Sequence, residues 1–420
     1  MTVVIDVRNE LLMILDANDI VRLKNYPFND EGLVNDEIRE RAWPILLGIN
    51  PFLDSYLNEL YKQNVIDWMQ LDPNTFHKDA DQVQKDVDRS FNTLYSTSSC
   101  YHHKGKSVED LKKRLFKLIM LVLKAIPQSN YYQGYHDVAL MALLHFSDDC
   151  SSFKFLYMLT LKYLRDHMMS GIHPTIVQLN LIPDIMKQID FQFYLIIQRV
   201  NPIYALSSII SLFTHEIENY QDVSIIWDSI FLNDDPQLPI YLYAALLIYY
   251  KEDIIMDLTE ICDSSGEINF DFDVDIVHSV LSKFIKKNLS INSIDSKHEV
   301  YKIIQLSLNL RKSVPMNSLK SFKHIYKNSF LKCTSGSLTV FQSLADEYHR
   351  YEIKQLRKKK HSALITRNKN NMISLLKISA GVGILGIILH VTFKQPTRFG
   401  IESNFAKAYI NLYQSIREYI

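Results

Sequence analysis

The chain has 420 residues, a formal net charge of −1 and 47% hydrophobic residues, enough for one large or two modest domains with a sizeable core. This balance argues against a disordered chain and against nucleic acid as a partner. Four widely separated cysteines, none in a C-x-x-C pair, indicate a reducing compartment and predict neither a disulfide framework nor a metal site. The mixed, acidic N-terminal residues predict no signal peptide.

Apolar residues recur at helical spacing along the chain, and eleven glycines are few, so the sequence predicts an all-α fold. We expect helices over residues 7–15, 38–47, 111–126, 138–146, 155–168, 176–200, 206–217, 240–250, 275–310 and 336–356. Polar composition predicts exposed loops at 94–108 and 251–274.

A short aromatic joint, Asn130–Asp137, lies between two of the expected core helices and reads Asn-Tyr-Tyr-Gln-Gly-Tyr-His-Asp. Pro127 ends the helix before it. Gly134 allows a tight backbone path. Apart from Asn130 at its start, Gln133 is the only residue of the joint whose side chain carries both an amide donor and a carbonyl acceptor.

A second pattern places Val83, Asp86 and Arg89 three residues apart, so that a helix presents them along one side. On spacing alone, Asp86 and Arg89 form an ordinary exposed ion pair worth a few tenths of a kcal/mol.

Together with Tyr-x-Gln-Gly at 131–134, this Val-x-x-Asp-x-x-Arg pattern resembles the two signature motifs of TBC-domain GTPase-activating proteins for Rab GTPases. Two further segments agree with that family in type and order. Residues 39–48 resemble its opening Arg-x-x-x-Trp-x-x-Leu-Leu-Gly, with Trp43 expected in the core, and 226–228 resemble its later Ile-Trp-Asp. The resemblance extends over about residues 31–250.

The resemblance implies a multi-helix TBC domain in which Arg89 is an arginine finger and Gln133 is a second finger that orients the attacking water. Asp86 would hold the first finger in place. The remaining expected supporting or Rab-binding residues are Tyr131, Gly134 and Asp137. The partner would be a Rab GTPase, which itself binds GTP and Mg²⁺, so the chain would need no cofactor and catalyse no independent reaction.

Two alternatives to a GTPase-activating protein remain open from the sequence. One is a Rab-binding scaffold that does not stimulate hydrolysis. The other is a membrane tether that uses its hydrophobic C-terminal part, with the helical domain as a scaffold. The residues Tyr132, Tyr135 and His136 differ from those in the commoner form of the family motif, which leaves the choice of Rab open.

The C-terminal part changes in composition. Residues 350–371 contain eight Lys or Arg and one Glu, and residues 372–393 form a 22-residue apolar stretch interrupted only by Lys377. This length predicts a single transmembrane helix. The alternative is a buried core helix, but Gly381, Gly383 and Gly386 are costly in a soluble helix and ordinary in a membrane one. The basic flank predicts a cytosolic N-terminal side, with the amphipathic segment 394–420 in the lumen. This segment is expected to lie on the membrane surface as a helix, and a partner-binding helix is the alternative. This layout resembles the membrane-anchored TBC proteins of the endoplasmic reticulum and early Golgi.

The expected organisation is therefore an N-terminal extension (1–28), a TBC domain (29–315), a helical and basic juxtamembrane linker (316–371), a transmembrane helix (372–393) and a luminal tail (394–420).

Overall fold

The structure is a computed structural model that describes residues 2–72, 76–91, 106–262, 272–289 and 296–393, all of them helical or irregular, with no strand among them. Side chains are not described for the helical residues 2–6, 261–262, 367–368, 370–371, 375–376 and 378–393. The all-α prediction is confirmed over the described residues. The chain divides into two compact units, Met1–Tyr348 and His349–Ile420.

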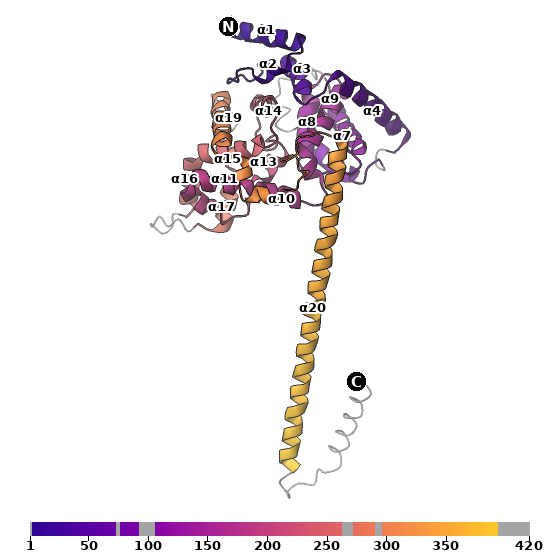
Figure 1. Cartoon of the computed structure of the whole chain (residues 1–420), viewed down its shortest axis with the longest axis vertical. Helices are drawn as coiled ribbons and strands as arrows, with labels where there is room; N and C mark the ends of the chain where they lie inside the picture. Colours follow the sequence, from indigo (N-terminus) through magenta and orange to yellow (C-terminus); the bar gives the residue numbers. More distant parts are fainter. Residues whose placement is uncertain (1, 73–75, 92–105, 263–271, 290–295, 394–420) are drawn as a thin grey trace. The chain divides into compact units, whose positions relative to one another are not determined.

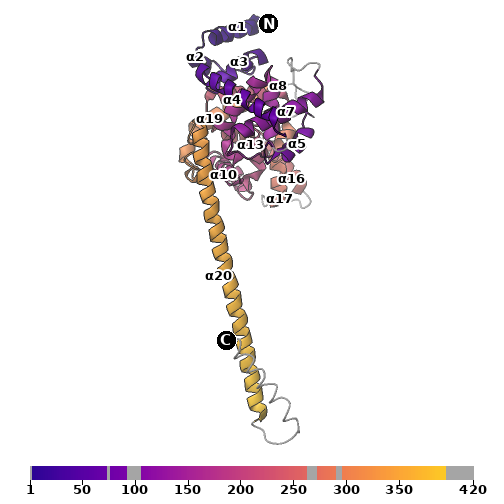
Figure 2. The ribbon, with the colours of Figure 1, turned by 90° about the vertical axis from the view of Figure 1, so that its right-hand side faces the viewer.

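The N-terminal half of the first unit is built around helix α7 (Val108–Ala125), which is labelled in Figures 1 and 2. Its elements are α1 (Thr2–Asp16), α2 (Ile20–Lys24), α3 (Asp36–Leu46), α4 (Pro51–Gln70), α5 (Ala80–Asp88), α7 (Val108–Ala125), α8 (Tyr135–His145) and α9 (Asp149–Leu159). Helix α7 packs against α4, α5, α8 and α9. Ser107 caps its N-terminus by accepting a hydrogen bond from the Asp110 amide at 3.1 Å.

The expected apolar face of α7 is fully formed. Its predicted members Leu111, Leu115, Leu118, Ile119, Val122 and Ile126 are all buried. Because α5 and α8 lie against this one helix, the two signature motifs, which are separated in the sequence, come to the same part of the molecule.

The second half begins with short helical turns and helices and ends with the longer α19 (Ser296–Ser313) and α20 (Leu338–Phe393). They are the π-helical turn η3 (Thr160–Leu164), the 3-10 turn η4 (Arg165–Met168), α10 (His173–Leu179), α11 (Leu181–Ile189), α12 (Phe191–Ile197), the 3-10 turn η5 (Pro202–Ala205), α13 (Leu206–Ile210), α14 (Tyr220–Asn233), α15 (Leu238–Tyr249), α16 (Lys251–Cys262), α17 (Val274–Leu281), α18 (Phe284–Asn288), α19 (Ser296–Ser313), the 3-10 turns η6 (Met316–Ser318) and η7 (Ser321–His324), and α20 (Leu338–Phe393). Helix α15 is almost entirely buried and packs against α11, α14 and α19.

Several predicted helices are divided in the structure. The expected helix 176–200 becomes α10, α11 and α12. The last break occurs where the Asp190 side chain accepts from the Phe193 amide at 3.0 Å and starts α12 as its N-cap. The expected helix 206–217 stops at Ile210, because Leu212 and Phe213 take positive φ values of 48° and 70°.

The prediction of a loop at 251–274 is wrong for its first half, which forms α16. Glu252 and Asp253 lie in its first turn, where negative side chains favour a helix, and Ile254 and Leu258 are buried. The acidic residues therefore mark the outer face and start of a helix. Residues 263–271, and 94–105 of the other expected loop, lie outside the described residues.

The predicted helix 336–356 is the first part of α20. Helix α20 continues beyond residue 356 and includes the segment 372–393. Among the described residues, no single helix is long and apolar enough to cross a membrane. One helix pair bent by 100°, Phe191–Ile197 with Pro202–Ile210, meets the same test of length and composition.

Candidate functional site

Arg89 lies at the C-terminal end of α5, as its C-cap residue. Val83 and Val87 of this helix are fully buried and hold it in the core. The last turn is held from α7, since Lys112 donates to the Asp88 carbonyl at 2.6 Å. The side chain of Arg89 is 62% exposed. A short, well-packed helix therefore presents this guanidinium at the surface.

Asp86 connects Arg89 to the second motif. Its carboxylate is completely buried and accepts hydrogen bonds from the Arg89 guanidinium, from Gln82 at 3.1 Å and from the Tyr131 hydroxyl at 2.8 Å. Burial, with the hydrogen bond to Asp86, raises the pKa of Tyr131 far above its usual range, so that its hydroxyl stays a donor. Spacing alone predicts an exposed ion pair. In the structure Asp86 is buried and also binds Gln82 and Tyr131, and of the ion pair only Arg89 is exposed.

The joint between α7 and α8 is held at both the backbone and the side chains. Asn130 binds the Met168 carbonyl through its backbone amide at 2.9 Å and its side-chain amide at 3.0 Å. The Tyr131 amide donates to Asp79 at 2.9 Å, and the Tyr132 hydroxyl donates to the Ile210 carbonyl at 2.7 Å. Three separate elements, α5, η4 and α13, therefore fix the path of this short segment.

Gly134 and Gln133 occupy the turn at the end of the joint. Gly134 is the N-cap of α8 with a φ of +108°, a conformation that side chains with a Cβ rarely adopt. A Cβ there would meet only the Ile210 side chain at an ordinary 3.6 Å, so backbone conformation, not space, requires glycine. Gln133 is exposed, and its side chain makes no hydrogen bond to any residue that the structure describes.

Asp137 lies in the first turn of α8 and bridges two histidines. One carboxylate oxygen is 2.8 Å from Nδ1 of His215 and the other is 3.2 Å from Nε2 of His136. The hydrogen bond to Asp137 raises the pKa of His215. Sequence reasoning singled out Asp137 but missed His215, because the contact joins residues 78 positions apart.

The other two motifs meet elsewhere, in the core. Asp228 is fully buried and accepts from Arg39 Nε at 2.9 Å, from the Trp43 indole at 2.8 Å and from the Leu33 amide at 2.9 Å. Burial, the largest single effect, lowers the pKa of Arg39, but the charges of Asp228 and Asp36 together with the hydrogen bond to Asp228 outweigh it and raise the pKa, so the guanidinium stays charged. The expected core position of Trp43 is confirmed.

Residues 36–255 match the family model described as the Rab-GTPase-TBC domain. The chain belongs to this family.

The relatives of this TBC protein include human TBC1 domain family member 20, which is 29% identical over 275 residues covering 64% of this chain and 59% of that protein. GTPase-activating protein GYP8 of Saccharomyces cerevisiae is 25% identical over 353 residues, 76% of this chain and 63% of that protein. The matched region thus spans less than two thirds of either relative. The crystal structure of the YPT/Rab-GAP domain of Gyp1p is similar at a TM-score of 0.48 and 15% identity, covering 72% of this chain and 99% of that one.

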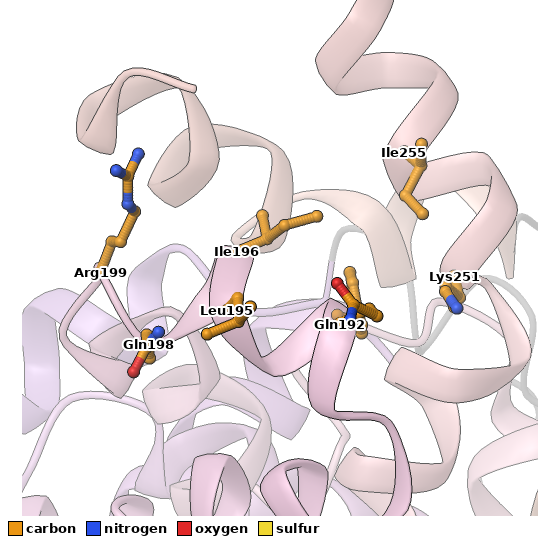
Figure 3. A pocket seen from close by; sticks show the side chains of 8 residues that line it. Gln192, Leu195, Ile196, Gln198, Arg199, Lys251 and Ile255 are labelled. Atoms are coloured by element: carbon orange, nitrogen blue, oxygen red, sulfur yellow. The ribbon is translucent and has the colours of Figure 1, made fainter. Parts of the chain in front are cut away.

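The TBC protein contains a cavity of about 550 Å³ (Figure 3). Its lining includes Leu195 and Ile196 of α12, Ile255 of α16, and the cations Arg199 and Lys251. Lys251 already pairs with Asp190 at 2.6 Å. None of the residues that line this cavity belongs to the four motifs.

Proposed function

We propose that this chain is a GTPase-activating protein for a Rab GTPase, to which it supplies Arg89 and Gln133 in trans. The observation that carries the proposal is the buried carboxylate of Asp86, which binds both the Arg89 guanidinium and the Tyr131 hydroxyl. One residue thereby links the helix that carries the arginine to the loop that carries the glutamine. GTP and Mg²⁺ would be bound by the Rab, and the chain would contribute no cofactor.

The chemistry suits an exposed arginine. Negative charge develops on the phosphoryl group during GTP hydrolysis, and a guanidinium stays charged while offering a planar fork of donors to phosphate oxygens. An arginine supplied in trans accelerates Ras-type hydrolysis by about 10³- to 10⁵-fold, a general magnitude taken from that system. This corresponds to roughly 4 to 7 kcal/mol of barrier. Arg89 is presented at a helix end from which its side chain can extend to a bound partner.

The proposed role of Gln133 is supported by its side-chain amide, which takes no part in holding the joint. A glutamine that served only to hold the joint would bind the backbone or neighbouring side chains, yet that work is done by Asn130, Tyr131 and Tyr132. The amide of Gln133 remains available for a water molecule at the Rab surface. This is the role that the family resemblance implies.

A Rab whose own switch glutamine is changed to alanine tests the proposal. If Gln133 supplies the water-orienting amide, this Rab should still respond to the wild-type chain, while Gln133→Ala should lose about 10²-fold or more on the unmodified Rab. Single-turnover GTP hydrolysis over a panel of purified Rab GTPases measures both. A resistant glutamine-deficient Rab would remove Gln133 from the chemistry, and no response from any Rab would favour a non-stimulating scaffold.

We further propose that the apolar segment 372–393 anchors the protein in the endoplasmic reticulum or early Golgi membrane. Its 22 residues are close to the roughly 20 that a bilayer core requires. The basic residues of 350–371 would keep the TBC domain on the cytosolic side, where Rab GTPases act.

A further inference from the structure

His136 is the second residue of α8, and its largely buried ring lies between the two signature motifs. Its Nδ1 atom accepts from the Gly134 backbone amide at 3.3 Å and lies 3.1 Å from the Tyr131 hydroxyl. Its Nε2 atom is 3.2 Å from Asp137, which in turn contacts His215 at 2.8 Å. A continuous set of polar contacts therefore extends from exposed His215 to the turn that contains Gln133.

The hydrogen bonds define which ring nitrogen carries the proton. The Gly134 amide is a donor, so Nδ1 of His136 must be the unprotonated acceptor. The Tyr131 proton is directed to the nearer carboxylate of Asp86 at 2.8 Å. The ring proton is therefore on Nε2, which lies 3.2 Å from Asp137.

We propose that His136 is a positioning residue for Gln133: its neutral ring fixes the Gly134 peptide, and Asp137 with His215 holds the ring in the tautomer that can do so. The argument rests on the proposed function, since it assigns a support to the glutamine finger. The bond to Gly134 resembles half of a capping box, in which a first-turn side chain accepts from the N-cap amide. Because the same peptide bond joins Gly134 to Gln133, fixing it restricts where the glutamine side chain starts.

This arrangement predicts a pH response. The titratable and charged groups that face His136 are Asp137 from α8, Asp86 and Arg89 from the end of α5, His215 after α13, and Tyr131 from the joint. Burial lowers the pKa of His136 below its ordinary 6.5, so the ring is neutral at neutral pH. Protonation of Nδ1 at lower pH removes its lone pair as an acceptor. The hydrogen bond from the Gly134 amide is then lost, and two N–H groups face each other.

Two substitutions separate the contacts of His136. In His136→Asn, the side-chain oxygen lies near the position of Nδ1 and can accept from Gly134, and it does not titrate. In His136→Gln, the longer amide reaches toward Asp137 but leaves the Gly134 amide without its acceptor. The control is His324→Gln, an exposed histidine of η7 outside the site.

The test uses the full-length chain in detergent and the Rab of the panel that the wild-type protein stimulates most, loaded with GTP. At about pH 7.5 we expect His136→Asn to stay within about threefold of wild type and His136→Gln to lose about tenfold in kcat, with KM unchanged. As the pH falls below the lowered pKa of His136, the rate ratio of wild type to His136→Asn should fall. Taking the ratio cancels any titration of the Rab.

A double-mutant cycle distinguishes positioning from simple stabilisation of the fold. If His136 acts through Gln133, then His136→Gln should cost almost nothing further in a Gln133→Ala background. An equal loss in both backgrounds, or parallel pH profiles for wild type and His136→Asn, would overturn the inference. That result leaves the proposed function intact, provided that Gln133→Ala by itself still strongly reduces Rab stimulation. The absence of any stimulated Rab would reject both.

Discussion

At the residue scale, the site depends on a carboxylate that is removed from solvent. Buried Asp86 receives hydrogen bonds from three side chains, so its charge is stabilised by directed donors instead of water. The Arg89 guanidinium is held at one end of this arrangement while most of its side chain remains accessible. The arginine is therefore oriented before a partner binds, while most of its side chain stays accessible to that partner.

The first prediction at this scale is that Arg89→Lys lowers Rab stimulation by about 10³-fold while the fold is retained. Lysine keeps the charge but has no planar fork that binds two phosphate oxygens. Single-turnover GTP hydrolysis and circular dichroism measure the two properties. The control is Arg22→Lys, another exposed arginine in an ion pair, which should leave the rate unchanged. A lysine variant within twofold of wild type would show that Arg89 is not the finger.

At the element scale, the joint between α7 and α8 depends on backbone geometry as much as on side chains. The chain must reverse within a few residues and begin α8 with a residue at a φ of +108°. Its flanks are held by contacts to α5, η4 and α13. Local strain at Gly134 should therefore affect the exposed Gln133 directly.

We predict that Gly134→Ala destabilises the protein by about 1–3 kcal/mol through its unfavourable φ and also reduces Rab stimulation at least about tenfold. Gly48→Ala is a matched control. Gly48 also has a positive φ, +87°, but a Cβ there would meet nothing within 4 Å and it lies after α3, outside the site. Denaturant unfolding should show a lower free energy of unfolding for both variants. Hydrolysis assays should show reduced Rab stimulation only for Gly134→Ala. Equal stimulation by the two variants would contradict this prediction.

A second element-scale prediction concerns the contact between α3 and α14. Asp228→Asn leaves the buried guanidinium of Arg39 without its main counter-charge and should lower the free energy of unfolding by about 3–5 kcal/mol. Asp36→Asn removes the partly exposed second partner of the same arginine and should cost about 1 kcal/mol or less. Urea denaturation compares the variants. Similar losses for both would show that Asp228 does not organise this part of the core.

At the scale of the whole molecule, the four motifs fall into two pairs with different tasks. The segments at 39–48 and 226–228 meet around Asp228 and stabilise the core. The segments at 83–89 and 131–134 meet around Asp86 and form the candidate site. Substitutions in the first pair should act through folding, and those in the second pair mainly through the rate of hydrolysis.

The prediction at this scale concerns membrane topology. A glycosylation acceptor appended after Ile420 should be modified in cells, and one placed before residue 1 should not, because the basic segment 350–371 favours the cytosolic side. A chain truncated after residue 371 should leave the membrane fraction on alkaline extraction and still stimulate the Rab in solution. Glycosylation of the N-terminal acceptor alone would show that the topology is the reverse of the one proposed.

Much of the helical content could be predicted from the sequence, because it depends on local spacing, whereas the candidate residues were identified by their resemblance to the family motifs. The apolar period of α7 lies within a single helix, and the i, i+3 spacing of Asp86 and Arg89 places both at the end of α5. The breaks at Asp190 and Leu212 were missed, since apolar periodicity continues through them while a cap and positive φ values end the helices.

Only the tertiary structure decided which of these residues act on one another. Asp86 meets Tyr131 across 45 positions, Asp137 meets His215 across 78, and Arg39 meets Asp228 across 189. Periodicity shows which face of a helix is buried but not which other face covers it, because that depends on the packing of α5, α8 and α13 around α7 and the joint. For the same reason, Asp86 could be read from the sequence as half of a surface ion pair, and only its burial shows that it connects both proposed fingers.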